Sequence, residues 1–166
     1  MRKLMRYMLV FVLIFFIVQS WTFFRYQPQE NSEFRIHPLG MRIYNMTRGA
    51  ISEKEWVGIF RVVDDASQEF KQCIGASLFP FEGKLFQRSI VIVPAERIFI
   101  FGEWVDRFVD LHSMFIRKDD FIIKALRHEW THLYLYVSGE RFLGDIFHRD
   151  PLFFEKCKFA SDDSDY

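Results

Sequence analysis

The sequence predicts an α+β fold in which a small mixed or antiparallel sheet packs on one long buried helix, after a single N-terminal transmembrane helix. Helical patterns over residues 53–71 and 121–137, short β-branched runs between them, and an uncharged N-terminal segment lead to this prediction. Half of the 166 residues are hydrophobic and 19% are aromatic, so one core can be buried.

The N-terminal segment, Tyr7 to Phe24, contains no charged residue and is preceded by Arg2, Lys3 and Arg6. A helix of this length spans about 27 Å, close to the hydrocarbon thickness of a bilayer. The preceding basic residues predict a single-pass protein whose C-terminal domain is extracytoplasmic. Bulky residues occupy the place of a small-x-small cleavage site, which favours an uncleaved anchor over a signal peptide that would give a secreted protein.

The rest of the chain reads as one domain. We expect a membrane anchor or signal peptide over 1–25, a polar linker over 26–35, the folded domain over 36–160 and an acidic tail over 161–166. After residue 25 there are 18 basic and 22 acidic residues, a balance of −4. A protein that tracks nucleic acid would need the opposite sign, so no nucleic-acid partner is expected.

The elements before the last helix follow from local patterns. Residues 40–46 suit a strand, and Ser52 with Glu55 forms a capping box that predicts a helix over 53–71. Residues 89–93 and 98–101 are short β-branched or aromatic runs on either side of Pro94, and both predict strands.

The helix over 121–137 contains neither Gly nor Pro. Asp119 or Asp120 is a suitable N-cap, and Gly139 stands where a C-terminal cap belongs. Apolar residues on several faces of this pattern predict that the helix is buried.

This helix carries the motif with the clearest chemistry, His128-Glu129-Trp130-Thr131-His132. Histidines four residues apart lie on the same helical face and can bind one zinc ion. Glu129, next to the first histidine, can act as general base on a zinc-bound water. The motif predicts a zinc hydrolase, and the alternative is a core helix with two hydrogen-bonded histidines.

Catalytic zinc usually has three protein ligands and an open position. The favoured third ligand is His148, which precedes Asp150 and Pro151, the N-cap and first residue of an expected second helix. Glu155 is the rival, because a carboxylate on a following helix is a common third ligand.

The spacing resembles that of the SprT-like zinc metallopeptidases. The H-E-W-T-H run is followed, after fifteen residues, by His148 and then by Asp150-Pro151-Leu152-Phe153, similar to the His-Gly-Pro-x-Phe segment of that family. The resemblance covers residues 119–159. Arg149 replaces the customary glycine, and one more residue separates the histidine from the proline.

The resemblance implies a zincin-like domain that hydrolyses peptide bonds in a peptide or protein substrate. His128, His132 and His148 match the family's zinc ligands, and Glu129 matches its catalytic glutamate. In zincin folds a strand upstream of the active helix lines the cleft and pairs with substrate, and residues 89–93 or 98–101 are the candidates.

Several assignments remain open from the sequence. Tyr134, Tyr136, Arg141 and Arg149 are candidates for the donor that stabilises the developing oxyanion. His37 and His112 have no motif around them and are expected at the surface or in capping positions. The oligomeric state is not encoded in any pattern.

The two cysteines, Cys73 and Cys157, fit either one disulfide or two buried thiols. Two other functions also fit the chain: a non-catalytic binding module in which zinc only joins two helices, and a structural membrane protein with a coincidental motif.

Overall fold

The computed structural model describes residues 7, 10, 12–14, 26–94, 98–100, 103–105, 107–109 and 113–140, with backbone alone for the three short segments between 98 and 109. The elements, in chain order, are β1 (Phe34–Ile36), β2 (Arg42–Asn45), α2 (Glu53–Ile74), a 3-10 turn (Gly75–Leu78), α3 (Glu82–Phe86), β3 (Ser89–Val93), β4 (Ile98–Ile100), β5 (Glu103–Val105), β6 (Arg107–Val109), β7 (Ser113–Arg117), a 3-10 turn (Lys118–Asp120) and α4 (Ile123–Val137). The fold is α+β, as predicted.

The main sheet is mixed. Its described strands lie in the order β1-β2-β3-β7-β6, with β2, β3 and β7 parallel and the outer strands β1 and β6 antiparallel to their neighbours. β4 and β5 form a separate antiparallel pair. The strands expected over 40–46, 89–93 and 98–101 are confirmed as β2, β3 and β4, whereas β1, β5, β6 and β7 were not predicted.

α2 begins where the capping box predicts. The Ser52 side chain accepts a hydrogen bond from the Glu55 backbone, and the Glu55 carboxylate accepts one from the Ser52 backbone at 2.8 Å. Lys118 also donates to Glu55, at 2.8 Å, and ties the start of α2 to the turn before α4. Hydrogen bonds from Lys118 and then Ser52 lower the pKa of Glu55 to about 2.

α4 begins two residues later than the sequence suggested. Ile122 is its N-cap residue and provides no side-chain cap. Asp120 belongs to the preceding 3-10 turn and forms an ion pair with Arg117, Oδ2 to Nε, at 3.3 Å. The end is as predicted: Gly139 follows the helix at φ +76°, a left-handed conformation in which glycine has no steric penalty.

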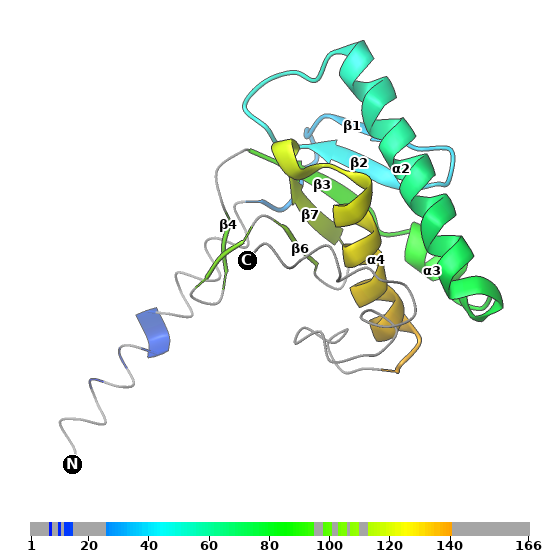
Figure 1. Ribbon diagram of the computed structural model, residues 1–166. Helices are drawn as coiled ribbons and strands as arrows, with labels where there is room; N and C mark the ends of the chain where they lie inside the picture. The colour runs from blue at the N-terminus through cyan, green and yellow to red at the C-terminus, as the bar shows by residue number, and fades with distance from the viewer. Residues whose placement is uncertain are drawn as a thin grey trace.

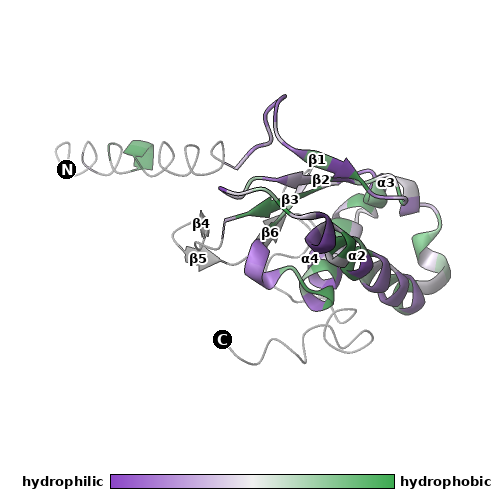
Figure 2. Ribbon diagram, turned by 90° about the horizontal axis from the view of Figure 1, so that it is seen from above, coloured by the Kyte–Doolittle hydropathy of each residue, from purple (hydrophilic) through white to green (hydrophobic). Residues whose placement is uncertain are grey.

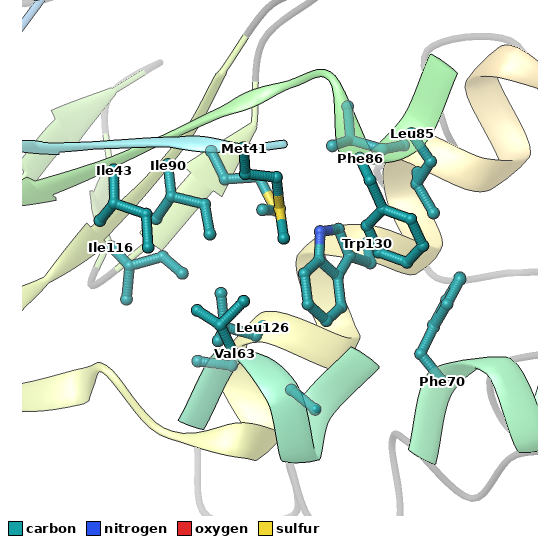
Figure 3. Close-up of a cluster of buried hydrophobic side chains, with 14 of the residues drawn as sticks. Met41, Ile43, Val63, Phe70, Leu85, Phe86, Ile90, Ile116, Leu126 and Trp130 are labelled. Carbon is teal, nitrogen blue, oxygen red and sulfur yellow. The ribbon is translucent and has the colours of Figure 1, made fainter. Parts of the chain in front are cut away.

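α2 and α4 cover one face of the sheet (Figures 1 and 2). The core between them contains the side chains of alternate strand residues, Ile43, Ile90, Ile92, Met114 and Ile116. Trp130 of α4 points into this core beside Met41 and Phe86 (Figure 3), and its ring centroid is 5.4 Å from that of Phe86. Trp130 therefore joins α4 to the core between the helices and the sheet.

The opposite face of the sheet carries a smaller apolar cluster of Tyr26, Val91, Val93 and Phe115. Residues 26–35 had been expected to form a linker, yet Tyr26 is buried in this cluster and β1 begins at Phe34. This polar stretch contributes to the sheet because strand pairing satisfies its backbone even where few of its side chains are apolar.

The predicted transmembrane helix is contradicted. No helix within the described part of the chain combines the length and the apolar character that a membrane crossing needs. α2 has 22 residues but is rich in charge, and α4 has only 15. The single-pass location that was predicted from Tyr7–Phe24 is therefore corrected. Most of residues 1–25 lie outside the described residues.

Candidate metal centre

α4 divides into two faces with different chemistry. Leu126, Trp130, Leu133 and Tyr134 share one side of the helix and belong to the hydrophobic core. His128, Glu129 and His132 project from another side of the helix but are also buried, with exposed fractions of 6%, 3% and 7%. Two histidines and a carboxylate are seldom buried side by side in a helix, so this side of α4 is the candidate site.

The two imidazoles converge. Nε2 of His128 lies 3.1 Å from Nε2 of His132, and the ring planes are 71° apart. Two nitrogens bound at about 2.05 Å to one tetrahedral zinc ion are separated by roughly 3.3 Å. The observed separation corresponds to an N–Zn–N angle of about 98° for two ligands of one ion. The same distance also fits a hydrogen bond between two neutral imidazoles.

Contacts with α2 hold α4, the helix that carries the motif, in position. Arg127, which precedes the first histidine, forms an ion pair with Glu69 of α2. Phe70 of α2 packs against Trp130 with ring centroids 6.1 Å apart. These contacts fix the rotation of α4 about its axis and therefore the direction in which the imidazoles point.

The strand next to this helix is β6, which contacts α4 and forms an edge of the main sheet. The two strands expected to line a cleft are placed elsewhere. β3 pairs with β2 on one side and β7 on the other, so its backbone has no open edge. β4 pairs with β5 in the separate hairpin. β6 was missed because three residues are too few to give a recognisable alternation.

A third ligand is not placed by this structure. Among the residues described, no group of three or more His, Cys, Asp or Glu side chains is arranged to hold a metal ion. His148 and Glu155, the two candidates from the sequence, lie outside the described residues, as do Arg141 and Arg149. The observed centre is therefore the pair His128 and His132 with Glu129 beside them.

Tyr134, a candidate oxyanion donor, belongs to the core face of α4. It is 3% exposed, and its hydroxyl donates to Glu140 at 3.3 Å. Burial, followed by the nearby Glu140 carboxylate, raises the pKa of Tyr134. In this structure the single O–H donor of Tyr134 is therefore used by Glu140.

His37 is not at the surface, contrary to the sequence expectation. It is 1% exposed, Nδ1 accepts from the Leu39 backbone at 3.2 Å, and Nε2 lies 3.3 Å from the Phe60 carbonyl and 3.5 Å from Asp64. The ring connects the turn before β2 to α2, which is a structural role. His112 lies outside the described residues.

Cys73, near the end of α2, is disulfide-bonded. The chain contains one other cysteine, Cys157, which lies outside the described residues. The choice left open by the sequence, one disulfide or two thiols, is therefore answered for Cys73.

Comparisons with known proteins give no relative: no protein-family model, curated protein or solved structure matches this chain.

Proposed function

We propose that this protein is a zinc-dependent metallopeptidase that hydrolyses peptide bonds in a peptide or protein substrate. The observation that carries the proposal is the 3.1 Å separation of the His128 and His132 Nε2 atoms, beside a glutamate that is 97% buried. This separation suits two ligands of one ion, and the neighbouring carboxylate suits proton transfer.

His128 and His132 would hold the zinc ion, and His148 is the third ligand that the sequence favours. When bound, zinc lowers the pKa of a coordinated water to about 7 and polarises a substrate carbonyl. The neutral imidazole of each histidine must present its lone pair at Nε2, which fixes the proton of each ring on Nδ1.

Glu129 would act as the proton carrier. Its carboxylate accepts a proton from the attacking water and transfers it to the leaving nitrogen of the peptide bond. Because Glu129 is almost fully buried, its carboxylate is shielded from bulk water, and proton transfer within the site is favoured over exchange with solvent.

The first test measures zinc in the purified full-length chain. We expect about one zinc per chain by mass spectrometry in the wild type, and a loss of most of it in His128→Ala and His132→Ala. His37→Gln is the matched control, since this buried histidine lies away from the pair. Zinc contents that are equal in the wild type and His128→Ala would refute the site.

The second test separates catalysis from metal binding. Glu129→Gln keeps the shape of the side chain but cannot accept the proton, so we expect zinc to be retained and cleavage of β-casein, an unfolded protein, to fall by at least 100-fold. Glu53→Gln, at the exposed start of α2, is the control and should cleave normally. A wild type that holds zinc but cleaves no bond in β-casein or a broad peptide library would favour a zinc-stabilised binding module.

A further inference from the structure

Tyr136 lies on the motif side of α4, one turn beyond the second histidine. At 100° per residue it is rotated by roughly 40° from His132 and by only about 20° from Glu129, around the helix axis. It is displaced by about 6 Å along the axis from His132, the spacing of neighbours on one helical face. No other tyrosine of α4 shares this position, because Tyr134 lies on the core face.

The exposure of Tyr136 differs from that of the motif residues. Its side chain is 38% exposed, whereas His128, Glu129 and His132 are each below 10%. Within the described part of the chain its hydroxyl makes no hydrogen bond. Tyr136 therefore stands where the buried centre meets solvent, with a polar group available for another molecule.

The direction of helical side chains adds to this placement. Long side chains on an α-helix lean toward its N-terminus and cover the preceding turn. The phenol of Tyr136 is long enough to extend over the turn that carries His132, so its hydroxyl can reach a molecule bound at the histidine pair.

We propose that Tyr136 donates a hydrogen bond to the carbonyl oxygen of the scissile peptide bond and stabilises the negative charge that develops on it. This assignment rests on the proposed peptidase function. A phenol supplies an O–H donor without adding a positive charge near the metal site, and no covalent bond to Tyr136 is formed or broken.

The test compares Tyr136→Phe with Tyr134→Phe in the full-length, zinc-loaded protein. Each variant removes one hydroxyl from the same helix, one on the motif side and one on the core side. For Tyr136→Phe we expect kcat on the fastest-cleaved β-casein peptide to fall on the order of 100-fold, with KM and zinc content nearly unchanged. For Tyr134→Phe, kcat should stay within about twofold, because its hydroxyl does not face the site.

A binding measurement supplies a readout apart from turnover. A phosphinic analogue of the same peptide mimics the tetrahedral geometry of the reaction, so calorimetry should give Tyr136→Phe a Kd larger by a factor similar to the loss in kcat. Equal kcat and Kd in Tyr136→Phe and wild type would overturn the role of Tyr136 while leaving the peptidase intact. A wild type with no cleavage at all would overturn both.

Discussion

The contact between α2 and α4 makes a prediction about stability that can be worked out from one side chain. Phe70 is fully buried on α2 and packs against two rings of α4, with centroid distances of 6.1 Å to Trp130 and 6.4 Å to Tyr134. Figure 3 shows that it projects from α2 toward the core around Trp130. Phe70→Ala removes this ring from the interface that supports the motif helix.

The expected loss of stability in Phe70→Ala follows from the burial of the ring and from the cavity that its removal leaves. Replacing a fully buried phenylalanine by alanine costs about 3–5 kcal/mol, which includes the lost ring contacts. A domain of this size is stable by about 5–15 kcal/mol, so the variant should fold but with little reserve. With a urea m-value of about 2 kcal/mol/M, the unfolding midpoint should fall by roughly 2 M.

The measurement is urea unfolding followed by circular dichroism at 25 °C, in buffer that contains a metal chelator. Phe79→Ala is the matched control, because Phe79 is 84% exposed and its removal should change stability by no more than about 0.5 kcal/mol. If Phe70→Ala lowered the free energy of unfolding by less than about 1 kcal/mol, or by no more than Phe79→Ala does, the packing of α2 on α4 described above would be refuted.

Three further predictions concern other parts of the fold. Burial lowers the pKa of His37, so the unfolded chain binds a proton more readily than the folded protein, and the free energy of unfolding should fall as the pH drops from about 6.5 toward the folded pKa. His37→Gln should weaken this pH dependence of stability, and stability-against-pH curves that run parallel for the wild type and the variant would contradict it. Reduction of the Cys73 disulfide should destabilise the protein by about 3–5 kcal/mol if it closes the long loop to Cys157; full alkylation of both cysteines without reductant would exclude the bond. Ser52→Ala should cost about 1 kcal/mol through loss of the capping box, while Ser52→Thr should be tolerated, with thermal unfolding as the measurement for both.

Local patterns in the sequence determined the features that depend on neighbouring residues. The capping box of Ser52 and Glu55 set the start of α2, and Gly139 marked the end of α4. The four-residue spacing of His128 and His132 required that their rings share a helical face, and their 3.1 Å separation agrees with it. These features were predictable because their physical causes act within one or two helical turns.

The start of α4 shows where local reasoning failed. Asp119 and Asp120 are good N-cap residues, but Asp120 instead pairs with Arg117, and the helix begins at Ile123 without a side-chain cap. The ion pair between Arg117 and Asp120 thus took the place of the expected cap. His37 was misjudged for a related reason, because its partners Phe60 and Asp64 are brought to it only by the packing of α2.

The sequence alone determined that two imidazoles and a carboxylate share one helix, because helical periodicity fixes their spacing. Only the tertiary structure decided which strand borders that helix, since β6 is too short to recognise and is defined by pairing with β7 and contact with α4. It also decided which tyrosine of α4 is exposed, because packing in the core buries Tyr134 and leaves Tyr136 at the surface.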